Sequence, residues 1–369
     1  GLHKMSSFWK NKKVFLTGHT GFKGSWMSLW LYNLGAEVYG YSLEPNTKEN
    51  LFEILNIKNK IKNSDIGNIR DIKTLKNSLN KAQPDIVIHM AAQPLVRLSY
   101  EEPIDTLHTN IIGTANLLEN LRYVKSIRAS VIVTSDKCYD NKERLHGYVE
   151  SEPMGGYDPY SVSKGCAELV TASYRRSFFA DSDYINHQNA IATARAGNVI
   201  GGGDWSQDRL IPDAIKCFEN NKTLSVRSPN AIRPWQHVLD PLAGYLQLAE
   251  ALYRKNIAFT SGWNFGPETS DILSVKDVVY LLEASWPNNI NWKIESLNQV
   301  HEANLLALNC EKAKSKLSWM PIWNVKKAIE NTVDWHLAYR SKQDMIKFSS
   351  AQINQYVLDS GYMNNGECK

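Results

Sequence analysis

Three glycines near the start of the chain restrict its fold more than any other feature. Gly18, Gly21 and Gly24 lie between a β-rich run at residues 14–17 and an apolar helical pattern that Gly35 closes. In such a turn the first glycine permits the tight bend, the second lets the backbone approach a phosphate, and the third lets the helix pack closely on the strand. The spacing predicts a dinucleotide-binding turn, with an ordinary strand-to-helix turn as the alternative.

Strand and helix patterns alternate from this turn through the first half of the chain. Runs typical of strands occur at residues 36–41, 61–66, 84–90, 129–134 and 190–195, and helical patterns at 71–79, 104–124 and 160–178. This strict alternation predicts the α/β class: a Rossmann-like, doubly wound parallel sheet with helices on both faces.

Beyond the last of these strands, the pattern changes to short elements rich in Trp and Pro. We therefore predict a smaller, discontinuous C-terminal substrate domain. The predicted division assigns residues 5–190 and about 235–260 to the dinucleotide-binding domain, 191–234 and 261–340 to the substrate domain, and 341–369 to a surface tail.

Composition excludes several other classes of protein. The formal net charge is +4 with both signs dispersed, so the chain has no basic stripe for nucleic acid, although it suits an anionic small substrate. No apolar run approaches the roughly 18 residues of a membrane span. The odd number of widely spaced cysteines argues against a disulfide framework or structural metal and favours the cytoplasm. They are Cys138, Cys166, Cys217, Cys310 and Cys368.

A candidate catalytic set follows from two residues spaced by one helical turn. Tyr160 and Lys164 place a phenol and an ammonium group on one face of a helix. A free tyrosine has a pKa near ~10, but a lysine one turn away favours the phenolate and makes Tyr160 a useful base. Thr134 ends a predicted central strand, at the edge where doubly wound sheets bind ligands. An exposed Tyr–Lys pair is the alternative.

The glycine spacing together with Thr134, Tyr160 and Lys164 resembles the extended short-chain dehydrogenase/reductase superfamily over about residues 10–335. Longer strings resemble its sugar-nucleotide 4,6-dehydratase branch, and in particular the group that acts on CDP-glucose. The strings that carry this resemblance are TGHTGFKGSW at 17–26, AQPLVR at 92–97, TSDKCY at 134–139 and RPWQHV at 233–238.

The resemblance implies a lyase that converts CDP-glucose to CDP-4-keto-6-deoxyglucose. Oxidation at C4 makes loss of water across C5–C6 possible, and the hydride then returns to C6. Tyr160 would take the C4 hydroxyl proton, Thr134 would orient that hydroxyl, and Lys164 would hold the phenolate and the nicotinamide ribose. Asp136 would protonate the leaving 6-hydroxyl. Many relatives carry glutamate in the next position as the C5 base; here Lys137 stands there, and its role as that base is a hypothesis, with a strand-end charge pair as the alternative.

NAD is expected as the cofactor, because the residues after the second predicted strand, 42–44, contain no arginine for a 2′-phosphate. The expected cofactor-binding residues are Gly18, Thr20, Gly21, Phe22, Lys23, Gly24, Asn68, Ile69, Ala91, Ala92, Gln93, Asn110, Tyr160 and Lys164. The expected substrate-binding residues are Arg97, Ser99, Arg195, Asn198, Arg209, Arg233 and His301, with Glu302 as an outer candidate. Arginine suits a diphosphate because of its fork of donors. No metal is expected.

Alternatives remain open at this point. Within enzymes they are a dehydratase acting on UDP-N-acetylglucosamine, another sugar-nucleotide dehydratase or an epimerase; outside enzymes, an NAD-binding regulatory protein on the same fold. The resemblance also implies a homodimer or dimer of dimers and a place in the synthesis of deoxyhexoses of lipopolysaccharide O-antigen. Neither a nucleic-acid partner nor a membrane partner is expected.

Overall fold

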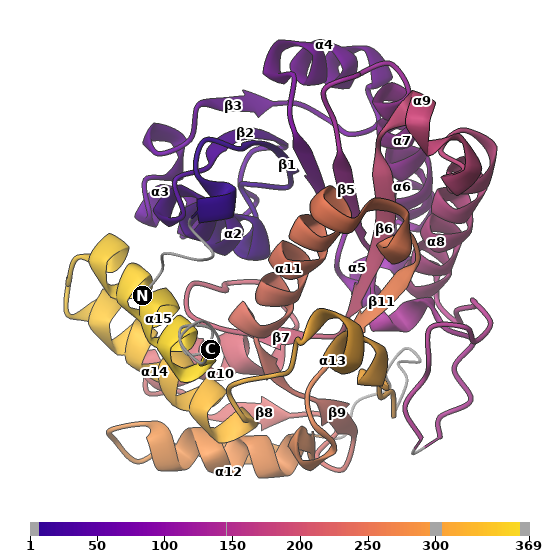
Figure 1. The fold of residues 1–369 in the computed structure, drawn as a ribbon. Helices are drawn as coiled ribbons and strands as arrows, with labels where there is room; N and C mark the ends of the chain where they lie inside the picture. Colours follow the sequence, from indigo (N-terminus) through magenta and orange to yellow (C-terminus); the bar gives the residue numbers. More distant parts are fainter. Residues whose placement is uncertain (1–6, 145, 296–304, 362–369) are drawn as a thin grey trace, which may run out of the picture.

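A seven-stranded parallel sheet forms the centre of the molecule in the computed structural model, which describes residues 7–144, 146–295 and 305–361 (Figure 1). Its strand order is β11-β6-β5-β4-β1-β2-β3. The strands are β1 (Lys13–Thr17), β2 (Glu37–Ser42), β3 (Asn63–Ile66), β4 (Ile86–His89), β5 (Ala129–Val133), β6 (Ala190–Ala196) and β11 (Gly262–Phe265). The predicted fold class is therefore confirmed.

Helices cover both faces of this sheet because its strands are apolar on both sides. Val14 and Leu16 of β1 pack with α2 (Phe22–Asn33) and α11 (Leu239–Lys255) on one face. Phe15, between them, packs on the other face. The helices of that second face are α4 (Ile72–Ala82), α7 (Gly113–Leu121) and α8 (Pro159–Ser177). Asp71 begins α4, as predicted: its carboxylate accepts two backbone N–H hydrogen bonds.

The order of the strands reverses between β1 and β4, since the chain runs outward to β3 from one and toward β11 from the other. In doubly wound sheets the crevice at the carboxyl end of this point is where ligands bind. The glycine turn follows β1 at this edge, and the segments after β4 and β5 end there too. The topology thus brings the candidate residues of three strand ends to one place.

The sheet extends further than the predicted domain division allowed. β6 and β11 pair with Cα register Gly262 to Thr193 and belong to the main sheet, whereas both ranges were expected in the substrate domain. The prediction divided the chain into contiguous segments. Because β11 lies about seventy residues beyond β6, this division assigned β11 to the other domain, although it forms the edge of the main sheet. Helix α11 packs on β5 and β6, in the range expected for the first domain.

The smaller unit consists of three short strand pairs and three helices with their own apolar cluster, which includes Phe218, Trp286 and Ile329. Its strands are β7 (Val199–Ile200), β8 (Leu224–Val226), β9 (Ile232–Pro234), β10 (Gln236–His237), β12 (Ile272–Ser274) and β13 (Trp292–Ile294), and its helices α10 (Leu210–Glu219), α12 (Val275–Ser285) and α14 (Val325–Arg340).

The C-terminal range expected as a surface tail instead forms helix α15 (Met345–Asp359) beside α14 and α2 (Figure 1). Ile353 and Tyr356 are fully buried. The Tyr356 ring meets Trp30 of α2 edge-on, and its hydroxyl donates to Asp240 Oδ1 at 2.7 Å. The expectation was wrong because the apolar positions of this helix match a surface made by distant parts of the chain.

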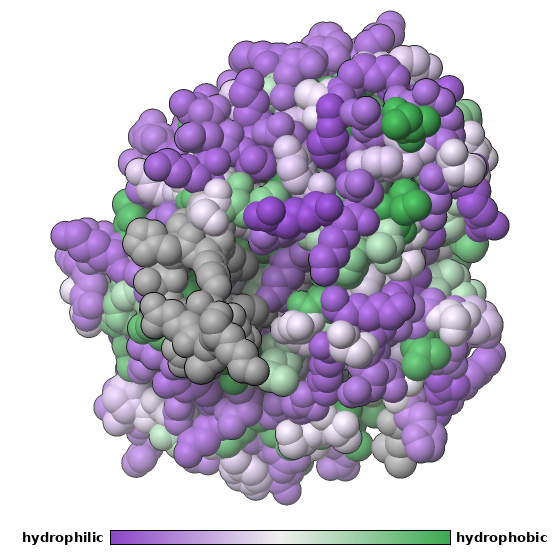
Figure 2. Space-filling model, in the orientation of Figure 1, coloured by the Kyte–Doolittle hydropathy of each residue, from purple (hydrophilic) through white to green (hydrophobic). Residues whose placement is uncertain are grey.

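The remaining helices are short or interrupted. The long helix expected over residues 104–124 is divided into α6 (Pro103–Leu107), a π-helical segment at His108–Ile112, and α7. The others are α3 (Leu51–Ile54), α5 (Val96–Glu101), α9 (Tyr184–His187) and α13 (Glu311–Leu317). Among the described residues, we find no helix whose length and apolarity would let it cross a membrane. Polar side chains dominate the face seen in Figure 2, with apolar ones scattered among them.

Candidate active site

A cavity of about 1220 Å³ lies at the carboxyl ends of the central strands, between the sheet and the smaller unit. Its lining joins the glycine turn, the ends of β2, β4 and β5, helix α8, and the loop and strands after β6. Most of the predicted site residues therefore meet in one place. We call the part around Tyr160 the chemistry end, and the part around Arg97, Asp208 and Arg227 the nucleotide end.

The glycine turn has the geometry expected of a phosphate cradle. Gly18 has a φ of +79°, which favours glycine, and a Cβ on it would lie 2.9 Å from backbone atoms at Met90 and Ala91. A Cβ on Gly24 would lie 1.9 Å from the Gly18 carbonyl oxygen, so α2 packs against the turn only because this residue has no side chain. Gly21 is exposed and lines the cavity at the start of α2, where the first N–H groups of a helix have no partner within the helix.

Most of the expected cofactor residues line this side of the cavity. Thr20 ties the turn to the end of β2, since its hydroxyl donates to the Leu43 carbonyl at 2.7 Å and contacts Ser42 Oγ at 2.8 Å. The expected residues that line the cavity are Gly18, Thr20, Gly21, Phe22, Lys23, Gly24, Asn68, Ile69, Ala91, Ala92, Tyr160 and Lys164.

Gln93 and Asn110 do not line the cavity. Asn110 exchanges hydrogen bonds with the Gln93 backbone and donates to Ser163 Oγ of α8 at 2.9 Å. The Gln93 side chain donates to Thr106 Oγ1 at 2.9 Å and closes a turn with Leu95. Both side chains hold the loop after β4 against α8, so the structure places them behind the binding surface rather than on it.

Tyr160 and Lys164 both line the cavity from α8, with the Lys164 Nζ 5.9 Å from the centre of the Tyr160 ring. Burial raises the pKa of Tyr160, while the Lys137 charge and a hydrogen bond with Ser135 pull it down. Burial also lowers the pKa of Lys164 to about 8. We expected Lys164 to favour the phenolate; in the described structure, Lys137 is the cation with the largest lowering effect.

Ser135, and not the predicted Thr134, faces Tyr160. Thr134 Oγ1 donates to Glu168 Oε1 at 2.6 Å, so its hydroxyl proton is directed away from Tyr160. Ser135 Oγ lies within hydrogen-bond reach of the Tyr160 phenol, whose pKa it lowers, and 3.0 Å from Asp136 Oδ1, and its single proton serves one of these two acceptors at a time. Successive side chains of an extended segment point to opposite sides, so a shift of one residue reverses the direction. Sequence reasoning missed Ser135 for this reason.

Arg195, expected to bind substrate, is instead buried beneath Thr134. Its guanidinium donates to both carboxylate oxygens of Glu168 at 2.8 Å and to the Tyr139 hydroxyl at 2.8 Å. It does not line the cavity. The charge of Arg195 opposes the effect of burial and keeps the pKa of Glu168 below its ordinary value. The Glu168–Arg195 pair thus supports the strand ends from behind.

Asp136 and Lys137 lie in a short 3₁₀ turn after β5, with Lys137 Nζ 3.7 Å from Asp136 Oδ1. Lys137 lines the cavity, whereas the Asp136 carboxylate is buried. A Cβ at Gly197 would lie 2.5 Å from Asp136 Oδ2, so glycine at that position leaves room for the carboxylate. The structure brings both residues close enough to Tyr160 for their charges to affect its pKa.

Lys23 adds a third lysine to the chemistry end. Its Nζ donates to the Tyr245 hydroxyl of α11 at 3.0 Å. Burial, followed by the charges of Lys164 and Arg209, lowers its pKa to about 7. The sequence marked Lys23 only as part of the glycine turn. Among the described residues, we find no cluster of three or more metal-ligating side chains at this site or elsewhere.

Four of the expected substrate residues line the cavity: Arg97, Asn198, Arg209 and Arg233. Ser99 does not, because its side chain is buried and its hydroxyl donates to the Val96 carbonyl at 2.5 Å. His301 and Glu302 lie outside the described residues.

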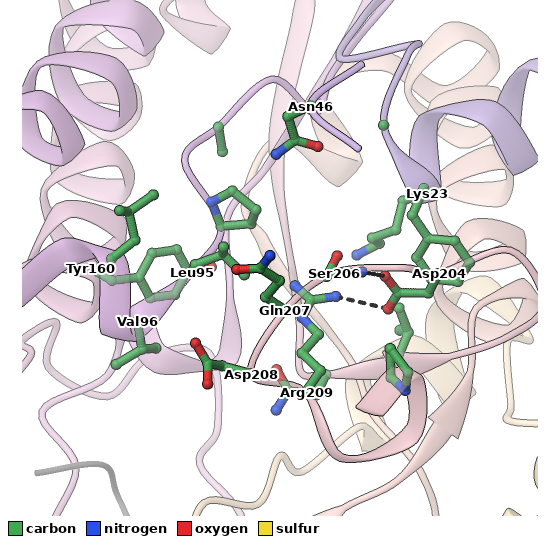
Figure 3. Close-up of a pocket in the computed structure, with 18 of the residues that line it drawn as sticks. Lys23, Asn46, Leu95, Val96, Tyr160, Asp204, Ser206, Gln207, Asp208 and Arg209 are labelled. Carbon is green, nitrogen blue, oxygen red and sulfur yellow. Dashed lines mark hydrogen bonds and ion pairs between the residues drawn. The ribbon is translucent and has the colours of Figure 1, made fainter. Parts of the chain in front are cut away.

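The loop 204–209 projects into the cavity (Figure 3). Arg209 NH1 donates to Asp204 Oδ2 at 3.3 Å. Two charged residues of this wall were missed by sequence reasoning: Asp208 in the loop and Arg227 after β8, joined at 3.1 Å. Neither belongs to a recognisable motif, so only their spatial neighbours reveal them.

Comparisons with known proteins agree with this geometry. Residues 15–332 match the family described as GDP-mannose 4,6 dehydratase. The chain is 51% identical to the CDP-glucose 4,6-dehydratase of Salmonella typhimurium over 95% of this chain and 98% of that protein. It is 26% identical to the dTDP-glucose 4,6-dehydratase of Haemophilus influenzae, over 73% of this chain and 81% of that protein.

Two solved structures share the fold at lower sequence identity. The UDP-glucose 4-epimerase from Brucella ovis in complex with NAD superposes with a TM-score of 0.74 at 21% identity, covering 89% of this chain and 98% of that one. Pal from Bacillus thuringiensis gives a TM-score of 0.75 at 22% identity, covering 88% and 99%. At these identities the likeness supports the fold alone.

Proposed function

The chain belongs to the GDP-mannose 4,6 dehydratase family of extended short-chain dehydrogenases/reductases, and we propose that it converts CDP-glucose to CDP-4-keto-6-deoxyglucose. The 51% identity to a CDP-glucose 4,6-dehydratase over nearly the whole of both chains supports this substrate. The observation that carries the reaction is the convergence of Tyr160, Ser135, Asp136 and Lys137 at one end of a single cavity. An enzyme of this kind is a hydro-lyase.

The glycine cradle fits NAD as the cofactor. Gly18, Gly21 and Gly24 leave backbone open at the start of α2 where a side chain would block a pyrophosphate, and the wall continues through Asn68, Ile69, Ala91 and Ala92. The related fold from Brucella ovis was solved with NAD. When bound, NAD supplies the oxidation at C4 and the reduction at C6, so it leaves the cycle unchanged.

In the oxidation step, Tyr160 takes the proton of the C4 hydroxyl. Ser135, hydrogen-bonded to that phenol, is placed to orient the same hydroxyl, a role the sequence assigned to Thr134. The charge of Lys137 favours the phenolate against the opposing effect of burial. Lys164, on the same face of α8, is placed to hold the cofactor ribose.

In the elimination step, the new C4 ketone makes the C5 proton acidic. Transfer of the Lys137 ammonium proton to Asp136, 3.7 Å away, leaves a neutral amine beside a carboxylic acid. Asp136 then gives this proton to the leaving 6-hydroxyl, and the Lys137 amine takes the C5 proton. The two side chains lie 3.7 Å apart, and Lys137 reaches the cavity while Asp136 lies behind it. Elimination across C5–C6 needs a base at C5 and an acid at the oxygen of C6. The turn that carries both residues places these two side chains next to each other.

Lys137→Met tests the assignment of the C5 base. With CDP-glucose, this variant should still develop the absorbance of reduced nicotinamide, because C4 oxidation does not need Lys137 as a base, although more slowly, because the Lys137 charge no longer favours the Tyr160 phenolate. It should fail to exchange C5 hydrogen for solvent deuterium and should form no product. Lys142→Met is the matched control, since Lys142 is exposed and pairs with Asp140 nearby. Unchanged turnover of Lys137→Met would exclude the role.

The choice of nucleotide is tested by offering CDP-, UDP-, GDP- and dTDP-glucose, together with UDP-N-acetylglucosamine, to the same preparation. We expect turnover of CDP-glucose to exceed the others, measured as the absorbance of the 4-keto sugar in base. Preference for UDP-N-acetylglucosamine would favour the other dehydratase, and absence of any turnover would favour the regulatory protein.

We also propose that the protein is a homodimer joined through α6 and α8 and that it acts in the cytoplasm. Ile104 and Leu169 on these helices are 75% and 57% exposed, so they offer an apolar surface to a second copy of the chain. Leu107, Ile111 and Tyr174 are partly buried. Leu169→Glu should convert the dimer to a monomer in sedimentation experiments.

Cys138, Cys166, Cys217 and Cys310 are free thiols, and Cys368 lies outside the described residues.

A further inference from the structure

One aspartate at the nucleotide end holds two arginines that come from opposite walls of the cavity. Asp208 Oδ1 accepts a hydrogen bond from Arg227 NH1 at 3.1 Å and forms an ion pair with Arg97 NH1 at 3.6 Å. Arg97 belongs to α5, next to the sheet, whereas Arg227 follows β8 of the smaller unit. All three residues line the cavity.

Two guanidinium groups that converge on one anion are typical of phosphate recognition, because each fork can donate two hydrogen bonds. In this structure the anion is a side chain of the protein. It carries one negative charge, whereas the diphosphate of a nucleotide sugar carries two. The arginines are therefore already positioned for an anion, and a doubly charged ligand would attract them more strongly than the carboxylate does.

We propose that Asp208 is an internal stand-in for the diphosphate of the substrate. It holds Arg97 and Arg227 in the free protein, and the diphosphate replaces its carboxylate when the nucleotide sugar binds. This inference rests on the proposed function for the identity of the ligand. It adds a competition between the loop 204–209 and the substrate that decides how tightly the substrate binds.

Because these side chains are partly exposed, replacing the Asp208 carboxylate by a diphosphate costs little free energy. Arg97 is 32%, Arg227 34% and Asp208 44% exposed, so solvent screens both ion pairs and each contributes little to stability. A buried pair would resist replacement, as the Glu168–Arg195 pair does at the chemistry end.

The backbone conformation at Asp208 restricts which substitutions this position accepts. Asp208 has a φ of +59°, in the left-handed region that few residues other than glycine adopt easily, although Asp and Asn tolerate it best. The same loop also supplies Asp204, which pairs with Arg209 at 3.3 Å. Two carboxylates of one short segment thus pair with three arginines that line the cavity: the exposed Asp208 holds Arg97 and Arg227, whereas the Asp204 carboxylate that holds Arg209 is only 5% exposed.

Asp208→Asn tests the proposal, because asparagine keeps the volume and tolerates the same φ but carries no charge. The KM for CDP-glucose should fall about fivefold, the size expected from losing two screened ion pairs that compete with the ligand. Inorganic pyrophosphate and CDP should become stronger inhibitors by a similar factor. Arg97→Gln and Arg227→Gln should change these quantities in the opposite direction.

Asp213→Asn is the matched control. Asp213 lines the same wall and also feels the charges of Arg227 and Arg97, but among the described contacts both ion pairs to these arginines come from Asp208. An equal fall in KM for both variants would mean that net charge alone is responsible, and this would overturn the proposal. An unchanged KM in Asp208→Asn would overturn it as well.

A rise in KM for CDP-glucose but not for UDP-glucose would show that Asp208 reads the base, since a carboxylate can accept from the cytosine amino group. That result would also overturn the proposal. Calorimetric binding of CDP and pyrophosphate separates this inference from the proposed function. If the wild-type protein fails to turn over CDP-glucose, the function is wrong; if turnover is normal and binding is unaltered in Asp208→Asn, only the stand-in role is wrong.

Discussion

The two ends of the cavity hold their charges in opposite ways. At the chemistry end, the Glu168 and Arg195 side chains are only 5% and 7% exposed, and Tyr160, Lys164 and Asp136 are buried as well. At the nucleotide end, the side chains of Arg97 and Arg227 are each about a third exposed and pair with one exposed carboxylate of the loop 204–209.

This difference in burial gives the two ends of the cavity different roles in catalysis and in binding. Burial shifts proton affinities: the pKa of Lys23 falls to about 7 and that of Lys164 to about 8, which is the range where a lysine can exchange protons near neutral pH. At the nucleotide end, solvent weakens each pair, so the arginines can change partner. We therefore expect substitutions at the chemistry end to affect kcat and stability, and substitutions at the nucleotide end to affect KM.

The largest effect is expected for Tyr160→Phe. Loss of the base for the C4 hydroxyl should lower kcat by about 10³-fold with little change in KM, because general base catalysis typically contributes 10²–10⁴-fold. Tyr174→Phe on the same helix is the control, since its hydroxyl donates to Glu119 at 3.1 Å away from the cavity. Steady-state kinetics with CDP-glucose measure both, and a kcat within tenfold of wild type would contradict the role.

Glu168→Gln should show how strongly the chemistry end depends on its buried pair. Removing one partner leaves the Arg195 charge buried without compensation, which should lower the free energy of unfolding by about 3–5 kcal/mol. The exposed pair of Glu250 and Arg254 on α11 provides the comparison: Glu250→Gln should cost under about 0.5 kcal/mol. Denaturant unfolding of both variants gives the two values; similar values would remove the contrast between buried and exposed pairs.

Ser135→Ala against Thr134→Val distinguishes the two neighbouring hydroxyls. Ser135→Ala removes the hydrogen bond to Tyr160 and should lower kcat about 10- to 100-fold, the effect of losing one hydrogen bond to a charged group. Thr134→Val removes a partner of Glu168 and should mainly lower the melting temperature. The reverse pattern in paired kinetic and thermal measurements would restore the assignment that the sequence suggested.

Arg233→Gln should raise KM for CDP-glucose about tenfold and leave kcat nearly constant, because this arginine lines the cavity at the nucleotide side and its NH1 donates only to the Ile232 carbonyl among the described contacts. The effect should shrink as the salt concentration rises. A KM that does not change with the substitution at any ionic strength would place the diphosphate elsewhere.

The smallest effect is expected from a buried acid outside both ends. Burial raises the pKa of Asp240 to about 7, from an ordinary value of 3.8. Because the folded pKa is the higher one, the stability that Asp240 contributes is complete below about pH 4 and is lost as the pH rises toward 7. Asp240→Asn should therefore gain a few degrees in melting temperature over wild type at pH 8 and less at pH 5. Equal gains at both pH values would contradict this.

The parts of the site that lie within one local pattern could be predicted from sequence. The glycine turn and the Tyr160–Lys164 pair depend on spacing inside one turn or one helix, and the structure has them in the cavity as expected. Arg195 was assigned to the substrate because arginine suits phosphate, but whether it reaches the cavity depends on Glu168, which lies on another element. Asp208 and Arg227 escaped notice because nineteen positions separate them along the chain.

By itself, the sequence determined the alternation of strands and helices, the bend after β1 and the residue types available for proton transfer, since these follow from periodicity and from side-chain chemistry. Only the tertiary structure decided that Ser135 rather than Thr134 meets Tyr160, that β11 completes the sheet, and that the C-terminal segment folds as α15 against Trp30. Each of these depends on the direction of a side chain or on contact between distant segments, and such contacts exist only once the chain is packed.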